Sequence, residues 1–368
     1  MKLRYRILTG LVAFAALALV SLAFAVSHDS PCTVPEALPD GTTRMKAIVQ
    51  RCYGSADVLK LEEIAKPIAA DDEVLVKVHA AAVNPLDWHY MTGRPYIMRM
   101  SSGLGAPQDI RMGVDFAGTV EAVGKDVKRF KPGDEVFGGR GGALAEYVTV
   151  REGRALARKP ANVSFEQAAA IPVAAITALQ GLRDKGRLQP GQKVLINGAS
   201  GGVGTFAVQI AKSLGAEVTG VCSTRNVDMV RSIGADHVID YTREDFTEGA
   251  QRYDLILDNV GNHGLLDTRR ALKPGGILVM VSGPKRDPWL GPIARVMQAA
   301  LLSPFVSEEL VKFFAELNQD DLNVLGALVR AGKLTPVIDR RYPLSEVPAA
   351  IQYLETGRAR GKVIINLE

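Results

Sequence analysis

Residues 193–205 read KVLINGASGGVGT, and this stretch decides the fold. An apolar, strand-like run is followed by Gly198, Gly201 and Gly204, with a spacing of G-x-x-G-x-x-G. Apolar residues then recur at helical spacing over residues 203–214. Glycines let the backbone approach a pyrophosphate closely, and the free N–H groups at a helix start favour its charge. The stretch therefore predicts a strand, a turn and a helix that bind a dinucleotide.

The next apolar run, residues 217–222, bears on which dinucleotide is bound. An NAD-selective site usually has Asp or Glu about 20 residues after the glycines to bind the ribose 2′-hydroxyl, whereas a 2′-phosphate needs cations and hydroxyls. Here the run ends in the sequence STRN at residues 223–226, which contains no carboxylate. We therefore expect NADPH, with Ser223 and Arg225 at the 2′-phosphate. The alternative is that Arg225 is a solvated residue of the following helix.

Composition sets the broad class of the protein. The 368 residues are 47% apolar, which is enough for two domains with sizeable cores plus a leader. The formal charge of +4 is spread along the chain, so we expect no nucleic-acid partner. Cys32, Cys52 and Cys222 form neither a C-x-x-C pair nor a disulfide framework, which favours a reducing compartment or indifference to redox conditions.

The first 44 residues differ from the rest. Basic residues precede an uncharged apolar run over residues 7–26, which as a helix would span about 30 Å, the thickness of a bilayer core. We expect this run to be a membrane anchor, so that the protein is membrane-associated through an N-terminal helix. A signal peptide cleaved near Ala25, or a cytosolic product that starts at Met45, stays open. Residues 28–44 are predicted to be an irregular linker.

The remaining chain divides by its pattern of strands and helices. Residues 45–168 show short strands separated by turns, which predicts a mostly β domain. Residues 169–334 alternate helical stretches with short apolar strands, which predicts a doubly wound parallel sheet. Residues 335–368 are expected to return to the β domain. The strands predicted in the parallel sheet are 193–197, 217–222, 237–240, 253–258 and 277–281.

Ligands bind at the carboxyl ends of strands in such a sheet, so Val260 and Ser282 are expected to face the cofactor. Between the last predicted strand and the return segment, residues 289–317 are apolar and form a helical insertion. A lid over an apolar substrate or a surface for a partner would use such residues, and ordinary core packing explains them too.

Several short motifs from residue 45 to residue 368 occur in an order typical of one family. They are NPLD at 84–87, GVDFAG at 113–118, PGDEV at 132–136, the glycine-rich turn at 199–204, GADHVIDY at 234–241 and GKV at 361–363. Together they resemble the medium-chain dehydrogenase/reductase superfamily, in its zinc-free quinone oxidoreductase and enone reductase branch. The resemblance implies an α/β fold with a Rossmann domain and a GroES-like catalytic domain, and a homodimer.

The resemblance also implies a set of site residues. Thr177 and Asn84 would lie near the nicotinamide, and Tyr241 would join Ser223 and Arg225 at the 2′-phosphate. The cofactor contacts expected from the glycine-rich turn are Ala199, Ser200, Gly201, Gly202, Val203 and Gly204.

Zinc is not expected in this chain. Zinc-dependent relatives have a cysteine where this chain has Asn84 and a histidine where it has Val114, and the four-cysteine structural lobe is missing. The five histidines form no cluster with the cysteines at metal-ligand spacing. The sequence therefore predicts no metal site.

Hydride transfer without a metal favours a conjugated acceptor. Reduction of an enone or a quinone gives a delocalised enolate or phenolate, which hydrogen-bond donors can stabilise. The candidate donors are His89, Tyr96 and the Asn84 amide, and a proton would come from Tyr96, His89 or water. Asp87 either braces the loop or takes part in catalysis.

The function that we expect is therefore an NADPH-dependent reductase of a small apolar carbonyl or quinone. Two alternatives remain. One is a non-catalytic NADPH-binding interaction protein at a membrane, suggested by the leader and by residues 289–317. The other is a zinc-free NADP-dependent alcohol dehydrogenase.

Overall fold

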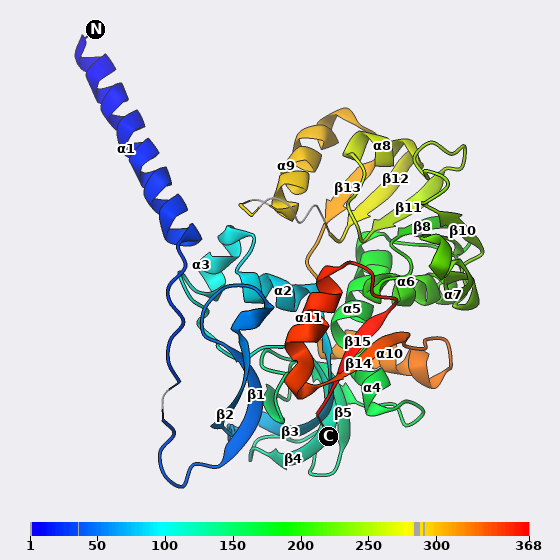
Figure 1. Ribbon diagram of the computed structural model, residues 1–368. Helices are drawn as coiled ribbons and strands as arrows, with labels where there is room; N and C mark the ends of the chain where they lie inside the picture. Colours follow the sequence, from blue (N-terminus) through cyan, green and yellow to red (C-terminus); the bar gives the residue numbers. More distant parts are fainter. Residues whose placement is uncertain (1, 36, 283–287, 290, 368) are drawn as a thin grey trace.

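The computed structural model describes residues 2–35, 37–282, 288–289 and 291–367, without the side chains of residues 2–10, 12, 19 and 292. Helix α1 (Lys2–Ser27) projects away from the rest of the chain (Figure 1). Within the described residues, no helix is both long enough and apolar enough to cross a bilayer. The anchor predicted over residues 7–26 is therefore not supported, and part of that run lies outside the described side chains.

A parallel sheet of six strands forms one half of the molecule. Its order is β10-β9-β8-β11-β12-β13, and every neighbouring pair is parallel. The strands are β8 (Lys193–Asn197), β9 (Glu217–Cys222), β10 (His237–Asp240), β11 (Tyr253–Asp258), β12 (Leu272–Met280) and β13 (Glu309–Lys312). This confirms the predicted doubly wound α/β sheet, to which the structure adds β13 at one edge.

Helices connect most of these strands in the order of the chain, whereas the described residues 241–252 join β10 to β11 without a helix (Figure 1). The central residues of β8, Val194, Leu195 and Ile196, are apolar and completely buried, as expected for a strand that is covered on both faces. Its Ile196 belongs to the same core as Ile176 of α5 and Phe206 of α6. The helices of this half are α5 (Pro172–Gln180), α6 (Gly202–Ser213), α7 (Val227–Ser232), α8 (Leu265–Arg270), α9 (Pro292–Leu302) and α10 (Gln319–Arg330).

The other half is mostly β, which confirms the second part of the predicted fold class. Strands β14, β15, β3, β4, β5 and β7 pair in that order, β6 pairs with β3, and β1 pairs with β2. Near the end of the chain, β15 lies antiparallel to β3. The strands are β1 (Arg44–Gln50), β2 (Leu59–Ala65), β3 (Glu73–Val83), β4 (Asp115–Val123), β5 (Glu135–Gly139), β6 (Tyr147–Arg151), β7 (Leu156–Arg158), β14 (Ile338–Pro343) and β15 (Lys362–Asn366).

Short helices lie between these strands. They are α2 (Pro85–Thr92), α3 (Arg99–Ser102), α4 (Phe165–Ala169) and α11 (Val347–Glu355). The division of the chain at residues 44, 168 and 334 stays a prediction.

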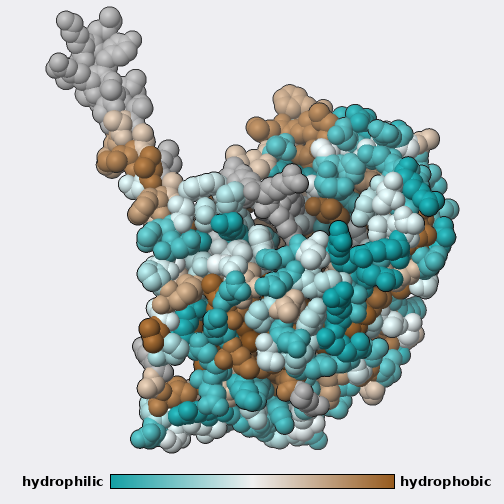
Figure 2. Space-filling view, in the orientation of Figure 1, coloured by the Kyte–Doolittle hydropathy of each residue, from teal (hydrophilic) through white to brown (hydrophobic). Residues whose placement is uncertain are grey.

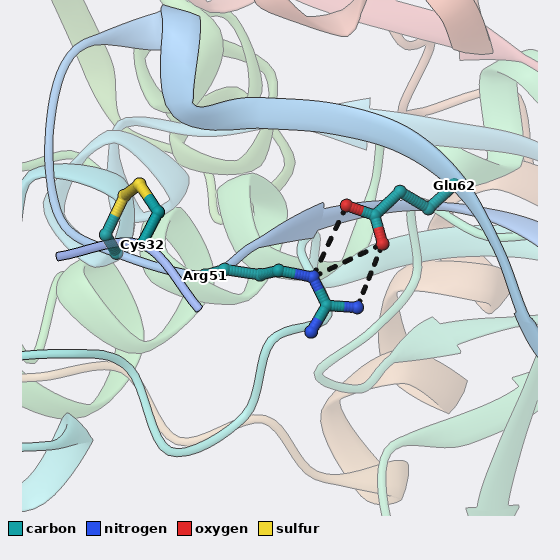
Figure 3. The surroundings of a disulfide bond; sticks show 4 residues. Cys32, Arg51 and Glu62 are labelled. Carbon is teal, nitrogen blue, oxygen red and sulfur yellow. Dashed lines mark hydrogen bonds and ion pairs between the residues drawn. A yellow bond between two sulfur atoms is a disulfide. The ribbon is translucent and has the colours of Figure 1, made fainter. Parts of the chain in front are cut away.

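A disulfide joins Cys32 to Cys52, and the expectation of a chain without disulfides is wrong. The two residues are 20 positions apart, with no spacing motif, and only the fold brings their Cα atoms to 4.6 Å. Beside the bridge, Arg51 donates to the Glu62 carboxylate of β2, with Nη2 and Oε2 2.9 Å apart (Figure 3). The segment expected to be an irregular linker is thus covalently attached to the mostly β half of the molecule.

Arg99 attaches the residues just before that bridge. Its side chain is 1% exposed and donates to the carbonyl oxygens of Val26 and His28, both at 3.2 Å. Its Nη2 also lies 2.8 Å from the Asp29 carboxylate. The end of α1 and the residues after it are therefore held by a buried guanidinium.

The insertion over residues 289–317 has two different faces. Arg295 and Ala299 of α9 are buried, so part of the insertion packs as core. Met297 and Leu301 of the same helix are more than half exposed. Figure 2 shows hydrophobic surface over the region where Figure 1 draws α9. Both the packing and the surface interpretations of this segment therefore apply to different side chains.

Candidate active site

The strand order reverses between β8 and β11, and in open α/β sheets ligands bind in the crevice at that point. The last residues of these strands, Asn197 and Asp258, meet there, and the Asn197 amide donates to the carboxylate at 2.8 Å. Arg295 of α9 donates to the other carboxylate oxygen at 2.6 Å. The buried charge of Asp258 is thus compensated within the protein, which leaves the crevice to the glycine-rich turn.

Glycine occupies three positions of this turn, and the structural reason differs at each one. Gly198 has φ +78°, and a Cβ there would lie 2.7 Å from the Val260 side chain. A Cβ on Gly204 would lie 2.1 Å from the Gly198 carbonyl oxygen, so this glycine permits close packing of α6. At Gly201 φ is −84°, and the nearest atom to a Cβ would be 3.5 Å away. None of the described atoms requires glycine at 201, which fits the approach of a ligand.

The start of α6 presents unsatisfied donors beside that space. Gly201 is the N-cap of this 12-residue helix, and no side-chain hydrogen bond caps it. The first N–H groups of an α-helix have no partner within the helix, and the helix dipole makes them attractive to anions. The open space at Gly201 and these N–H groups fit the pyrophosphate of a dinucleotide.

The end of β9 gathers the polar residues predicted for the ribose. The Asn226 amide donates to the Ser200 hydroxyl at 3.0 Å and to the Ser223 hydroxyl at 3.2 Å, which brings the turn and the strand end together. The buried Oδ1 of Asn226 has no hydrogen-bond partner among the described atoms. An unpartnered buried acceptor at this point fits a missing ligand donor such as a ribose hydroxyl.

Arg225 and Tyr241 lie at the outside of the same strand ends. Arg225 is exposed and donates to the Arg358 carbonyl oxygen at 2.7 Å, and Tyr241 is 60% exposed. The nearby carboxylate, Asp240, accepts hydrogen bonds from Thr224 and Thr242, which hold its pKa below the usual range. These bonds engage Asp240 with the protein, while the side chains of Arg225 and Tyr241 stay accessible.

On the nicotinamide side, Thr177 of α5 is 9% exposed, and its hydroxyl donates to the Val173 carbonyl oxygen at 2.6 Å. Val260 and Ser282 follow the carboxyl ends of β11 and β12, Val260 being 43% exposed and Ser282 half-buried. Their assignment to the cofactor stays a prediction.

A buried cluster lies below the glycine-rich turn. Lys362 donates to the Asn84 amide oxygen at 2.5 Å and to the Asp115 carboxylate at 3.1 Å. The Asn84 amide nitrogen donates to the same Asp115 oxygen at 3.0 Å and to the Ala82 carbonyl oxygen at 3.4 Å. Because both amide hydrogens have acceptors in the protein, Asn84 can donate to a substrate oxygen only by giving one of them up.

Asp87 braces this loop. Its Oδ2 accepts a hydrogen bond from the Asn84 backbone N–H at 2.7 Å, and its buried Oδ1 has no partner among the described atoms. Burial, helped by the Asp115 charge, raises the pKa of Asp87 to about 7, although the Asn84 N–H and the Lys362 ammonium oppose this rise. This hydrogen bond supports the first of the two roles expected for Asp87, that of bracing the loop.

The described atoms enclose a cavity of about 720 Å³ in the catalytic half, a size suited to a small molecule. Leu86, Tyr90 and Val114 line it together with Leu317 of the other half. Burial and the Asp87 charge raise the pKa of Tyr90. Tyr90 is not among the site residues predicted from the sequence. It lies on the helix that starts after the predicted site residue Asn84, and a tyrosine so close to a site residue is a candidate proton donor.

His89 and Tyr96 do not belong to the residues that line this cavity. The Nδ1 of His89 donates to the Arg94 carbonyl oxygen at 2.6 Å, because a carbonyl oxygen can only accept. The Tyr96 ring contacts Trp289 edge to face at 5.1 Å and lies 4.7 Å from the Arg99 guanidinium. The structure therefore places both at a neighbouring surface, and their catalytic role stays a prediction.

Within the described part of the chain, no three His, Cys, Asp or Glu side chains gather in a group that could hold a metal ion. Asn84 is engaged with Lys362 and Asp115, and Val114 contributes an apolar wall to the cavity.

Two protein-family descriptions match the chain. Residues 70–161 match the alcohol dehydrogenase GroES-like domain, and residues 233–365 match the zinc-binding dehydrogenase family. Together they cover parts of both halves of the fold.

Similar proteins cover most of the chain. The 2-methylene-furan-3-one reductase of Solanum lycopersicum is 36% identical over 88% of this chain and 79% of its own length. The chloroplastic NADPH-dependent alkenal/one oxidoreductase of Arabidopsis thaliana is 35% identical over 87% and 79%. The solved quinone oxidoreductase of Coxiella burnetii superposes with a TM-score of 0.77 at 32% identity, over 89% of this chain and 100% of its own. The chain therefore belongs to the medium-chain dehydrogenase/reductase superfamily.

Proposed function

We propose that this protein is an NADPH-dependent oxidoreductase that reduces quinones or α,β-unsaturated carbonyls by hydride transfer. The observation that carries this proposal is the open space at Gly201, which lies before the uncapped start of α6 at the point where the strand order reverses. The names of the similar proteins, an alkenal/one oxidoreductase and a quinone oxidoreductase among them, support the substrate class.

The preference for NADPH is supported by charge at the end of β9. Arg225 is exposed there, and the Asp240 carboxylate accepts hydrogen bonds from Thr224 and Thr242. A dianionic 2′-phosphate would gain an ion pair with Arg225, whereas a 2′-hydroxyl would find no accessible carboxylate at Asp240.

A reduced nicotinamide, when bound, supplies the hydride. The chain has to hold the acceptor and stabilise the charge that develops on its oxygen. Leu86 and Val114 give the cavity apolar surface for a conjugated ring or chain. The Tyr90 phenol is protonated at neutral pH, as any ordinary tyrosine is, and it lines the cavity, so it joins His89 and Tyr96 as a candidate donor to that oxygen.

A substrate panel tests the proposed function. The purified full chain is mixed with NADPH or NADH and with enones, quinones, aldehydes or alcohols, and cofactor absorbance is followed. We expect oxidation of NADPH with enones or quinones. Binding of NADPH without turnover of any compound would support a non-catalytic protein instead, and oxidation of alcohols with NADP⁺ alone would support an alcohol dehydrogenase.

Arg225→Ala tests the cofactor preference. Hydrogen bonds to charged groups contribute about 1.5–3 kcal/mol, so KM for NADPH should rise roughly 10- to 100-fold while KM for NADH changes little. Arg231→Ala removes the same charge from the neighbouring exposed helix α7 and serves as the control. Equal effects of Arg225→Ala on both cofactors would contradict a phosphate contact.

A further inference from the structure

Lys362 lies where four segments of the proposed site meet. It is the first residue of β15, and the residue before it, Gly361, forms a β-bridge with Gly201 of the cofactor turn. Its side chain runs past Gly202, where a Cβ would lie 3.3 Å from the lysine Cδ. The ammonium at its end contacts Asn84, so the side chain of Lys362 extends from the glycine-rich turn to the mostly β half of the molecule.

Each partner of this ammonium begins an element that lines the site. Asn84 is the N-cap of α2, the helix that carries Leu86 and Tyr90 into the cavity. Asp115 begins β4, directly after the cavity residue Val114. Two elements that carry cavity-lining residues or directly follow one, α2 and β4, are therefore both attached to the Lys362 ammonium.

Asp115 extends the connection to the cofactor side. Its Oδ1 accepts a hydrogen bond at 2.9 Å from the Val173 backbone N–H, in the first turn of α5. Thr177, predicted to lie near the nicotinamide, is one turn further along this helix. One carboxylate thus links the lysine, the asparagine and the start of the Thr177 helix.

The charges fix the orientation of the Asn84 amide. Its oxygen faces the Lys362 ammonium, and its nitrogen faces the Asp115 carboxylate. A reversed amide would point its N–H groups at the ammonium and its oxygen at the carboxylate, and both contacts would be repulsive. The cluster therefore has one arrangement.

Burial makes this arrangement costly to change. Lys362 is 3% exposed and Asp115 is completely buried. A buried ion pair contributes little net stability, because desolvation of the two ions offsets their attraction, so its better-supported use is to specify geometry.

We propose that Lys362 is a positioning residue of the reductase site: its buried ammonium sets the substrate-side elements α2 and β4 at a fixed distance from α5 and the cofactor turn. This inference rests on the proposed function, since it concerns the gap that a hydride must cross. Reacting atoms must lie within about 3–3.5 Å, and small displacements from that distance reduce the rate strongly.

Lys362→Met is the first test, with Lys159→Met as a matched control. Lys159 has a side chain that is only 6% exposed and is also paired with a carboxylate, that of Glu135, but it lies outside the cluster. We expect kcat of Lys362→Met to fall at least about tenfold, while the Kd of NADPH, measured by fluorescence titration, changes less than about threefold. Lys159→Met should leave kcat within about twofold.

Two results would overturn the proposal. If Kd for NADPH weakens at least tenfold while kcat is retained, Lys362 is a cofactor ligand. If the two lysine variants lose kcat alike, the effect is one of general stability.

The double variant Lys362→Met with Asp115→Asn covers the case in which the single variant does not fold, because it also removes the Asp115 charge that the single variant leaves uncompensated. It should fold and still show the tenfold loss of kcat. Recovery of the full rate in this variant would contradict the positioning role.

Hydrogen exchange supplies a readout that does not depend on turnover. In Lys362→Met, or in the double variant, the backbone amides at the starts of α2 and α5 should exchange faster together, with no such change in Lys159→Met. Faster exchange at the start of only one of these two helices would contradict a connection between them through Lys362. A wild-type chain that reduces no acceptor would refute the proposed function, and the exchange result would still decide the connection through Lys362.

Discussion

Lys362 and Arg99 are both buried cations, with 3% and 1% of their surface exposed, but their surroundings differ. Lys362 faces two side chains, Asn84 and Asp115, and the carboxylate is itself buried. Arg99 faces backbone carbonyl oxygens, the rings of Tyr53 and Tyr96 at 4.3 and 4.7 Å, and one carboxylate that is 57% exposed. The first cation is balanced by one buried carboxylate, and the second by many partial charges together with one exposed carboxylate.

The two cations also differ in which parts of the chain they hold: Lys362 holds the proposed site, and Arg99 holds the N-terminal segment. The acceptors of Lys362 lie within residues 70–161, the match to the GroES-like domain. Several acceptors of Arg99 lie at residues 26–29, before that match. Tyr53, which stacks on Arg99, also lines the cavity. The N-terminal segment is therefore attached beside the cavity by a cation that is separate from the Lys362 cluster.

The largest effect on stability is expected at Lys362. Removing one partner of a buried ion pair costs about 3–5 kcal/mol, because the other charge is left uncompensated. Lys362→Met should lower the free energy of unfolding by about this amount in a urea titration, and adding Asp115→Asn should restore part of it. A loss below about 1 kcal/mol would mean that Asp115 is not charged in the folded chain.

Loss of the Cys32–Cys52 bridge should have the next largest effect. Closing a loop of 20 residues stabilises a fold by about 3 kcal/mol in the chain-entropy description. Cys32→Ser, or treatment of the wild type with a dithiol reductant, should lower the midpoint of thermal unfolding. The reductant should have no further effect on Cys32→Ser, and any such effect would contradict the bridge.

Asp87 should make stability depend on pH near neutrality. Its pKa is about 7 in the folded chain against an ordinary value of 3.8, so the folded chain binds more protons between these values. The contribution is fully present below about pH 4 and is lost as the pH rises through 7, with a slope of at most about 1.4 kcal/mol per pH unit.

Asp87→Asn keeps the acceptor for the Asn84 N–H and should remove this slope, as measured by urea unfolding between pH 5 and pH 8. The slope should shift to higher pH in Lys362→Met, because the ammonium opposes the rise in the pKa of Asp87. An unchanged slope in Asp87→Asn would assign it to another group.

The smallest effect is expected at Asp29. Its carboxylate is 57% exposed, so solvent screens its ion pair with Arg99, and pairs of this kind contribute about 0–1 kcal/mol. Asp29→Asn should lower the free energy of unfolding by less than 1 kcal/mol. A loss as large as that of Lys362→Met would remove the distinction between the two cations.

The fold could be predicted wherever burial imposes a pattern. Five strands of the parallel sheet were located from apolar runs, because strands covered on both faces need apolar residues at every position. Strand β13 (Glu309–Lys312) lies within residues 289–317, whose apolar residues recur at helical spacing, so the sequence predicts a helix there and the strand is missed.

The site could be predicted only in part, for a similar reason. The glycine-rich turn is local in sequence, and its position at the reversal of strand order follows from the strand pattern. The connection from Lys362 to Asn84 spans 278 residues, and the two residues meet only because β15 pairs with β3. The bridge from Cys32 to Cys52 likewise depends on where β1 ends, which no spacing rule contains.

The bridge also bears on metabolism. A bond between Cys32 and Cys52 persists where the surrounding thiol pool is oxidised, whereas cytosolic glutathione and thioredoxin keep thiols reduced. The proposed reductase, working with this bond closed, would have to draw its electrons from a pyridine-nucleotide pool that is itself kept reduced beside oxidised thiols. Its flux would then depend on how that pool is replenished, as much as on the supply of its acceptor.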